Sequence, residues 1–386
     1  MPSYFCKGGI YVITIVAAAD NKYVKHMGVM IQSLIFNTRS LCRLQFLIID
    51  GGITEENKKK LELLISSYST VELNILVPEI SGIKNLRTDK HISEAAYLRL
   101  LIPQILGSNE IEKVIYLDSD LIVNKDIEKL WDVELSGYAL AAVQTLNFNR
   151  HKQLNMDKGV KYFNSGVLCI NLTKWRKENL SKRIIKFINE NRTKVIYHDQ
   201  DGMNAILYND WIELDPSWNL TSQLLYLGKY SKDELPNIIH YTEASKPWQL
   251  LNNHPFKKEY EKYLAMTPWK DDIPPENDVV YKLLMDKRII IFGSGGSGLR
   301  LLERVMELNG TVSYFLDNNK ELSGKEVNGK KIHTPNVLAD ETIDEIFIII
   351  ASMYYVDIEK QLTELGLKRL KHFVSLGYEN ELLKEW

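Results

Sequence analysis

Short apolar runs that alternate with amphipathic stretches are the feature that most limits what this chain can fold into. Such alternation predicts an α/β layered fold with a mostly parallel sheet. Ligands of such sheets gather at the carboxyl ends of the strands, where Asp20 and Asp118–Asp120 are expected to lie. The expected strands of the first two thirds are Ile10–Ala19, Leu44–Ile49, Val71–Val77 and Lys113–Leu117, and the expected helices are Met27–Phe36, Thr54–Ser66 and Ser93–Leu106.

The pattern changes twice further along the chain. From Tyr138 to Ile239 it loosens into polar and aromatic loops around two short strands and one helix, predicted at Tyr138–Gln144, Gly166–Asn171 and Ser181–Asn189. Three prolines and several acids in Thr267–Asp278 then indicate a boundary. We therefore expect a domain at 1–266, a linker at 267–286 and a second α/β unit at 287–386, with strands at Arg288–Phe292, Thr311–Leu316, Glu345–Ala351 and Lys371–Ser375.

Composition excludes several classes of protein. The 386 residues carry 48 Lys and Arg against 50 Asp and Glu, and this balance gives no general attraction to nucleic acid. Only Cys6, Cys42 and Cys169 are present, which excludes a disulfide framework and suits a reducing compartment. Ile10–Ala19 is too short to span a bilayer and lacks the flanks of a signal peptide. We expect an intracellular protein without a transmembrane segment.

A pair of carboxylates is the first candidate for chemistry. Asp118 and Asp120 follow an apolar strand, and hard cations such as Mg²⁺ and Mn²⁺ prefer carboxylate oxygens and bridge to phosphates. His240, after the apolar Ile238–Ile239, offers a further ligand, and Lys246 offers a point charge for phosphate. In isolation, the alternatives are a solvated turn for the two acids and a structural role for the histidine.

Three other polar segments lie at the ends of expected elements. Asp20 follows three alanines, which would let a planar base approach the backbone. Phe163–Gly166 precedes a short strand, and Asp199–Asp201 precedes a helix. The alternative for the first is a strand-ending turn, and for the last it is an N-cap that satisfies unpaired amides.

A glycine-rich loop opens the second unit. Gly293–Gly298 matches G-x-G-x-x-G after a strand and before a helix, and Asp317 lies 19 residues beyond Gly298. This is the context of the dinucleotide fingerprint, so NAD is a candidate ligand. The unit is about half of a full dinucleotide fold, and the alternative is a tight turn in a degenerate nucleotide-type domain.

Taken together and in this order, the motifs resemble glycosyltransferase family 8, over roughly Ile10–Leu264. The resemblance implies a GT-A fold, a retaining reaction, a UDP-sugar donor and Mn²⁺, with Mg²⁺ as the alternative metal. The second unit resembles the small Rossmann-like domain at the front of nucleotide-sugar dehydratases and sugar O-acyltransferases, which implies an accessory or binding role. The matching segments are Ala17–Asp20, His91–Ser93 with Tyr97 and Arg99, Tyr116–Asp120, Phe163–Val167, Asp199–Asp201, His240–Tyr241 and Lys246–Trp248 in the first region, and Gly293–Gly298, Phe315–Asn318 and Gly329–His333 in the second.

The resemblance also implies a role for individual residues. Asp118, Asp120 and His240 would hold the metal. The catalytic group would comprise Asn164, Asp199 and Gln200, beside the donor sugar. Two positions differ from the family pattern, because Lys22 stands where Asn is frequent and Glu243 where a small residue is frequent. The residues expected to bind the donor, including its uracil, ribose and phosphates, are Ala18, Asp20, Lys22, Arg99, Asp118, Ser119, Asp120 and Lys246.

The implied reaction moves a hexose, galactose or glucose, from the UDP-sugar to an acceptor hydroxyl. Retention requires either a covalent intermediate on Asp199 or on the amide oxygen of Gln200, or attack from the face of the leaving group. An amide is a poor nucleophile, which favours same-face attack. A bacterial glycan, glycoprotein or glycolipid is the expected acceptor, with the enzyme in the cytoplasm or peripheral to the inner face of the membrane; the oligomeric state is left open. The alternatives are an NAD-dependent nucleotide-sugar oxidoreductase or epimerase, and a non-catalytic sugar-nucleotide-binding scaffold.

Overall fold

A computed structural model describes residues 11–39, 42–79, 95–107, 111–231 and 233–386. The chain divides into two compact units. The first consists of Met1–Thr242 and Lys262–Lys270, and the second of Glu243–Glu261 and Asp271–Trp386. Cys6 and the His91–Ser93 motif lie outside the described residues. The expected division at 266 stays a prediction.

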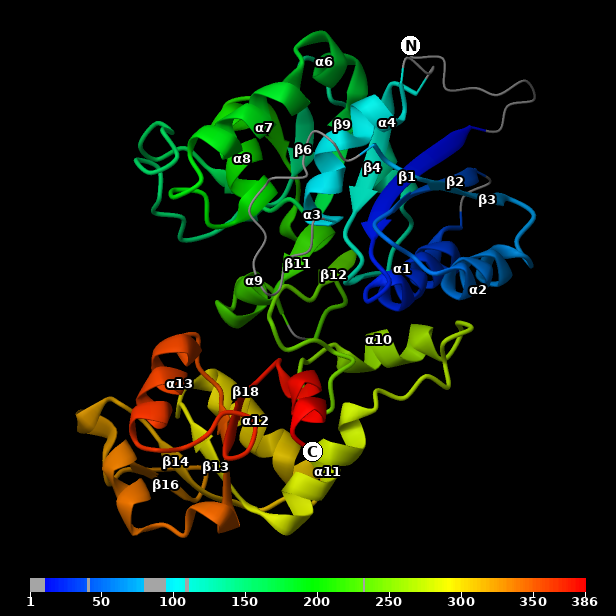
Figure 1. Cartoon of the computed structure of the whole chain (residues 1–386). Helices are drawn as coiled ribbons and strands as arrows, with labels where there is room; N and C mark the ends of the chain where they lie inside the picture. Colours follow the sequence, from blue (N-terminus) through cyan, green and yellow to red (C-terminus); the bar gives the residue numbers. More distant parts are fainter. Residues whose placement is uncertain (1–10, 40–41, 80–94, 108–110, 232) are drawn as a thin grey trace. The chain divides into compact units, whose positions relative to one another are not determined.

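A mixed seven-stranded sheet forms the centre of the first unit, which confirms the predicted mixed, mostly parallel α/β class (Figure 1). Neighbouring strands are parallel except at β9, which runs antiparallel to both β4 and β6. The order of the strands across the sheet is β10 (Trp211–Glu213), β6 (Leu140–Ala142), β9 (Val167–Asn171), β4 (Lys113–Leu117), β1 (Val12–Ala19), β2 (Arg43–Asp50) and β3 (Val71–Leu76).

The sequence of β1 suits its central place in this sheet. Seven of its eight residues are buried, because strands pair with it on both sides and helices cover it, and such strands are apolar throughout rather than alternating. Val16 and Ala18 pack into one core cluster with Tyr97, Tyr116 and Phe163. In Figure 1, α1 and α2 lie beside β1–β3, and α6–α8 lie beside β6 and β9.

The helices of the first unit largely follow the predicted pattern, with one correction. The helix expected over Ser93–Leu106 is broken within its described part into α3 (Ala95–Leu98), the 3₁₀ helix η2 (Arg99–Leu101) and α4 (Ile102–Ile105). Pro103 lies in the first turn of α4, where its missing N–H costs nothing. The remaining helices are α1 (Val24–Asn37), α2 (Glu55–Ile65), α5 (Glu128–Trp131), α6 (Leu172–Lys177), α7 (Leu180–Glu190), α8 (His198–Leu207), η3 (Pro216–Asn219) and α9 (Ser222–Tyr226).

A small side sheet receives the chain where it leaves β4. Its strand order is β11 (Leu220–Thr221), β12 (Ile238–His240) and β5 (Leu121–Val123). The expected strand Tyr138–Gln144 is divided, because Gln144 belongs to β7 (Gln144–Thr145), which pairs with β8 (Tyr162–Phe163). In the described part of the chain, every helix is too short or too polar to cross a membrane.

The second unit contains a six-stranded sheet that is parallel except at the short edge strand β15. At the fingerprint, a Cβ on Gly298 would lie 1.9 Å from the carbonyl oxygen of Gly293, so only glycine allows this approach of helix to strand. In sheet order the strands are β15 (Glu326–Val327), β16 (Lys330–His333), β14 (Val312–Leu316), β13 (Arg288–Phe292), β17 (Ile346–Ile350) and β18 (Phe373–Ser375); the helices include α12 (Gly296–Glu307), α13 (Tyr355–Glu364) and the 3₁₀ helix η7 (Glu379–Lys384).

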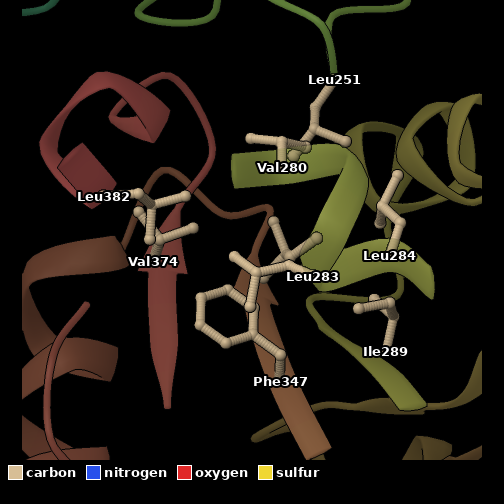
Figure 2. A pocket seen from close by; sticks show the side chains of 9 residues that line it. Leu251, Val280, Leu283, Leu284, Ile289, Phe347, Val374 and Leu382 are labelled. Atoms are coloured by element: carbon tan, nitrogen blue, oxygen red, sulfur yellow. The ribbon is translucent and has the colours of Figure 1, made fainter. Parts of the chain in front are cut away.

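Two segments outside 287–386 contribute to this second unit. Helix α11 (Glu276–Asp286), within the expected linker, places Leu283 and Leu284 in its core. Leu251 joins the same core from the segment Glu243–Glu261, and Figure 2 shows it at a small apolar pocket beside α11. The same segment is held by hydrogen bonds, since Gln249 Nε2 donates to the carbonyl of Gly377 (3.0 Å) and Arg304 Nε donates to that of Leu250 (2.8 Å). Helix α10 (Lys257–Leu264) continues from it.

A buried carboxyl group gives the second unit a pH-dependent stability. Burial raises the pKa of Glu379 to about 7, although the backbone amide of Gly377 donates to its carboxylate. Between about pH 4.3 and pH 7 the folded state keeps a proton that the unfolded state has lost, so the free energy of unfolding falls as pH rises through this window.

Glu379→Gln should remove this fall. We expect the variant to match the wild type near pH 4.5 and to exceed it by about 2–3 kcal/mol near pH 8, as measured by urea denaturation at both pH values. Glu385→Gln, at an exposed position in the same terminal segment, is the control and should change nothing. Equal pH dependence in wild type and Glu379→Gln would contradict the assignment.

Candidate active site

Strand pairing in the side sheet brings a histidine from far along the chain beside two neighbouring acids. Asp118 follows β4, and Asp120 immediately precedes β5. The antiparallel pairing of β12 with β5 sets His240 opposite Leu121, and the amide of Tyr241 donates to the carbonyl of Asp120 (3.1 Å). His240 therefore ends its strand beside the two acids that the sequence pairs.

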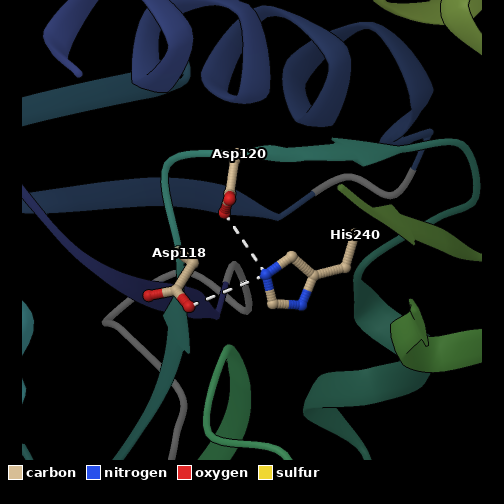
Figure 3. Close-up of side chains that lie close together, drawn as sticks. All are labelled: Asp118, Asp120 and His240. Carbon is tan, nitrogen blue, oxygen red and sulfur yellow. Dashed lines mark ion pairs between the residues drawn. The ribbon is translucent and has the colours of Figure 1, made fainter. Parts of the chain in front are cut away.

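The ligand atoms of this cluster are spaced as a cation requires. His240 Nε2 lies 3.3 Å from Asp120 Oδ1 and 3.8 Å from Asp118 Oδ2, and Figure 3 shows one ring nitrogen facing both carboxylates. An octahedral cation with bonds of about 2.1 Å places neighbouring ligand atoms about 3 Å apart and opposite ones about 4 Å apart. One atom from each residue lies within 4.8 Å of the others, so the three residues fit a single divalent ion.

The carboxylate oxygen of Asp118 that points away from His240 accepts hydrogen bonds from other side chains. Asp118 Oδ1 accepts from the hydroxyl of Tyr116 (2.9 Å) and from Nη2 of Arg99 (2.9 Å). Its Oδ2 faces His240. Two charged or strongly polar donors on one oxygen fix the carboxylate, and they leave the other oxygen turned toward the cluster.

Arg99 links the cluster to the buried carboxylate of Asp199. Its Nε lies 3.1 Å from Asp199 Oδ2, and its Nη1 donates to the carbonyl of Ser165 (2.6 Å). Burial acts to lower the pKa of Arg99, but Asp118 and Asp199 outweigh it and the pKa is raised. Burial likewise raises the pKa of Asp199 from its ordinary value, while Arg99 opposes that rise. The guanidinium stacks over Tyr116, 4.6 Å from the ring centre.

Gln200 and Asn164, both predicted from the sequence, are in contact. Asn164 Nδ2 donates to Gln200 Oε1 (3.1 Å), and the amide of Ser165 donates to the same oxygen (3.0 Å). Gln200 Nε2 donates to Tyr162 Oη (3.1 Å). Both lone pairs of the Gln200 amide oxygen therefore have donors.

The alternative assignment of the acidic triplet to an N-cap is wrong for Asp199, which binds Arg99 and Ser165. Helix α8 begins after Tyr197, which makes no side-chain cap. Asp201 instead accepts from the backbone amides of Ile196 and Tyr197, at 2.7 and 2.9 Å. One acid of the triplet thus satisfies free amides, and another belongs to the candidate site.

The residues expected to bind the nucleoside lie where β1 and β4 end. Ser119 Oγ donates to the carbonyl of Ala18 (3.0 Å), so these two residues are in contact. Asp20 Oδ1 accepts from the amides of Lys22 and Tyr23, at 2.9 and 3.0 Å. This is the turn that the sequence offered as the alternative for Asp20; binding of a base or ribose there stays a prediction.

Lys246 and the glycine-rich loop belong to the second unit. The amide of Lys246 donates to Gln249 Oε1 (2.7 Å). The departure at Glu243 has an internal partner, because its carboxylate lies 4.0 Å from Arg300. Asp317 is the acid that the dinucleotide fingerprint would assign to ribose. Its Oδ2 accepts from the hydroxyl of Ser294 in the glycine-rich loop (2.6 Å).

Sequence reasoning missed two residues that shape the cluster. Asn219 Oδ1 lies 2.8 Å from His240 Nδ1, yet a single asparagine in a loop rich in polar and aromatic residues carries no signal. Gly166 lies in the Phe163–Val167 motif, but the sequence indicates no role for it by itself. A Cβ at this position would lie 2.2 Å from His240 Cε1 and 2.7 Å from Asp118 Oδ2, so glycine keeps the space that the cluster occupies.

Gly166→Ala is expected to weaken binding of a divalent cation about 100-fold, because the added methyl group overlaps His240 and Asp118. A Mn²⁺ titration followed by electron paramagnetic resonance measures this. Gly295→Ala is the control, because open space surrounds that position and its φ of −79° suits alanine. Unchanged affinity in Gly166→Ala would contradict the role of the glycine.

Comparison with known proteins agrees with this architecture. The family model described as glycosyl transferase family 8 matches residues 14–251, and one described as C2185-like, N-terminal, matches residues 285–373. General stress protein A of Bacillus subtilis (strain 168) is 36% identical over 272 residues, which cover 67% of this chain and 95% of that protein. Lipopolysaccharide 1,2-glucosyltransferase of Escherichia coli (strain K12) is 28% identical over 274 residues, with 68% and 80% covered.

A solved structure has the same fold as the first region. The galactosyltransferase LgtC, in complex with donor and acceptor sugar analogues, aligns with a TM-score of 0.60 and 23% identity. The alignment covers 67% of this chain and 99% of that one. This likeness identifies the GT-A fold. The family model matches well over half of the chain, and the chain therefore belongs to glycosyltransferase family 8.

Proposed function

We propose that the chain is a retaining, metal-dependent hexosyltransferase that moves galactose or glucose from a UDP-sugar to a hydroxyl of a bacterial glycan or glycoconjugate. Family membership makes it a transferase with a nucleotide-sugar donor and a glycan acceptor. The observation that carries the finer proposal is the cluster of Asp118, Asp120 and His240, whose spacing suits one divalent ion.

The proposed metal is Mn²⁺, with Mg²⁺ as the alternative. Carboxylate oxygens suit both ions, whereas an imidazole ligand suits first-row transition metals better than Mg²⁺. When bound, the cation would neutralise negative charge on the leaving diphosphate. Lys246, which the family resemblance assigns to phosphate, would add positive charge. The nucleoside is assigned to Ala18, Asp20, Lys22 and Ser119 on the same resemblance.

The contacts of Asp199 and Gln200 favour same-face attack over a covalent intermediate. Asp199 Oδ2 is held by Arg99 and Ser165, and the Gln200 amide oxygen already accepts two hydrogen bonds. A nucleophile must free a lone pair, and the Gln200 oxygen would first have to break one of these bonds. In the proposed reaction the bond from the anomeric carbon to phosphate breaks, the acceptor oxygen bonds to that carbon, and its proton passes to the departing phosphate oxygen.

Proteins similar to this chain differ in the sugar named for them. One relative is a glucosyltransferase and the solved neighbour is a galactosyltransferase. Glucose and galactose differ at one hydroxyl, and a site distinguishes them through the polar groups that face that hydroxyl. Arg99, Asn164, Asp199 and Gln200 are the residues we assign to the donor sugar. Location in the cytoplasm or peripheral to the inner face of the membrane stays a prediction.

The test is release of UDP from a panel of UDP-sugars, with Mn²⁺, with Mg²⁺ and with EDTA. We expect UDP-galactose or UDP-glucose to be turned over with Mn²⁺ and the rate to fall to background with EDTA. Proton magnetic resonance of the early product reports whether the α configuration is kept. Turnover that EDTA does not reduce, or none with any UDP-sugar, would overturn the proposal.

A further inference from the structure

We infer that Asn219 is a positioning residue that holds His240 in the tautomer able to bind the cation. The inference rests on the proposed metal-dependent function. Asn219, at the end of η3, and His240, at the end of β12, are both buried. Asn219 Oδ1 lies 2.8 Å from His240 Nδ1, and Asn219 Nδ2 donates to Asn164 Oδ1, also at 2.8 Å.

Two backbone amides fix the direction of this chain of hydrogen bonds. The amide of Gly166 donates to Asn164 Oδ1 (2.9 Å), and the amide of Ser165 donates to Gln200 Oε1 (3.0 Å). A backbone N–H can only donate. The atom of Asn164 near Gly166 must therefore be its oxygen, and its amide nitrogen is the atom that faces Gln200 Oε1.

The orientation of Asn219 follows from that of Asn164. Because Asn164 Oδ1 is an acceptor, Asn219 must turn its NH₂ group toward it, and its own oxygen then faces His240 Nδ1. With Asn219 flipped, two amide oxygens would face each other in a partly buried place, at a cost of about 1–3 kcal/mol. His240 must then carry its proton on Nδ1, and Nε2 keeps its lone pair.

This tautomer is the one that a metal ligand needs at this position. Nε2 is the ring atom that faces Asp118 and Asp120, and Figure 3 shows the other nitrogen turned away from both acids. A hydrogen bond to the second nitrogen of a ligating histidine fixes the ring and raises its basicity. Asn219 thereby joins the metal cluster to Gln200 through Asn164.

The decisive experiment is a double-mutant cycle read by Mn²⁺ affinity, which does not depend on turnover. Asn219→Leu keeps the branching of the side chain at Cγ and removes both hydrogen bonds. When introduced alone, it is expected to weaken Mn²⁺ binding by about 10- to 100-fold. When added to His240→Ala, it is expected to have no further effect on Mn²⁺ binding. A merely structural role would weaken both backgrounds equally, and equal loss would overturn the inference.

Two further variants keep the test decisive. Asn219→Asp retains an acceptor for His240 Nδ1, so its Mn²⁺ affinity should exceed that of Asn219→Leu. The reverse order would contradict the proposed role of Asn219. If Asn219→Leu unfolds, Asn219→Ala takes its place in the cycle. Asn237→Ala is the matched control, since Asn237 Nδ2 donates to Ser217 Oγ (2.8 Å) and this bond links the residue before β12 to η3 without involving His240.

Failure of the inference and failure of the proposed function give different results. Unchanged Mn²⁺ affinity in Asn219→Leu would reject the role of Asn219 while leaving metal-dependent transfer intact. A wild type that binds Mn²⁺ but transfers no sugar would reject the proposed function, and the cycle would still decide the role of Asn219. A wild type that binds no divalent cation would overturn both.

Discussion

Asp120→Asn is expected to reduce sugar transfer about 1,000-fold, equivalent to about 4 kcal/mol of transition-state stabilisation. The variant keeps the shape of the side chain but replaces the charged oxygen that lies 3.3 Å from His240 Nε2. Less positive charge would then be held against the leaving diphosphate. Steady-state kinetics at saturating donor, together with Mn²⁺ affinity, measure the loss.

Controls separate the loss of metal from a loss of fold. Asp118→Asn should behave like Asp120→Asn, because its Oδ2 belongs to the same cluster. Asp132→Asn changes an exposed acid of the first unit and should leave kcat and KM unchanged. If Asp120→Asn turns over UDP-sugars as well as the wild type, the metal-centred enzyme is refuted and a non-catalytic scaffold becomes the better explanation.

Arg99→Met should have the largest combined effect on stability and activity. It removes the buried cation between Asp118 and Asp199 and the stacking on Tyr116. Breaking a buried ion pair by removing one partner costs about 3–5 kcal/mol, because the remaining charges stay buried. We expect a loss of stability of about 3 kcal/mol and at least about 100-fold slower transfer, since Asp118 loses a donor that fixes it.

Chemical denaturation and kinetics of the same preparation check both parts of this prediction. Arg43→Met is the control, because the Arg43 side chain is about half exposed and its partner Glu72 lies 4.0 Å away; it should change stability by less than about 0.5 kcal/mol. Arg99→Lys should recover little, because one ammonium cannot reproduce the planar, multidentate contacts of the guanidinium. Wild-type stability in Arg99→Met would refute its role as the counter-ion.

Local pattern predicted the sheet well because the strands of this fold are buried. The predicted Lys113–Leu117 is β4 to the residue, and Thr54 caps α2 by accepting from the amide of Asn57. Both features depend on neighbours in the sequence. Pattern failed at Ser93–Leu106, where the described part is three short helices rather than one; apolar spacing alone does not distinguish an α-helix from a 3₁₀ turn.

The candidate site was predictable only in part, because its formation depends on long-range pairing. Nothing in the local sequence sets His240 beside Asp120; the register of β12 on β5 does. The family resemblance supplied that link where periodicity could not. Asn219 had no such signal, because its two side-chain partners, Asn164 and His240, lie far from it in the sequence. The burial of Arg99 between two carboxylates was equally invisible in the sequence.

The path of the chain through Leu251 has a practical consequence for anyone who wishes to dissect this enzyme. A fragment truncated at 266 would retain Glu243–Glu261 but lose α11, β13 and β18, which surround Leu251. It would also lose Gly377 and Arg304, the partners of Gln249 and Leu250. In such a fragment the Leu251 side chain would be exposed to water, and Gln249 and Leu250 would lack their hydrogen-bond partners. Loss of activity in the fragment would therefore indicate a damaged fold and not a catalytic role of the missing residues. Point substitutions in the intact polypeptide avoid that ambiguity.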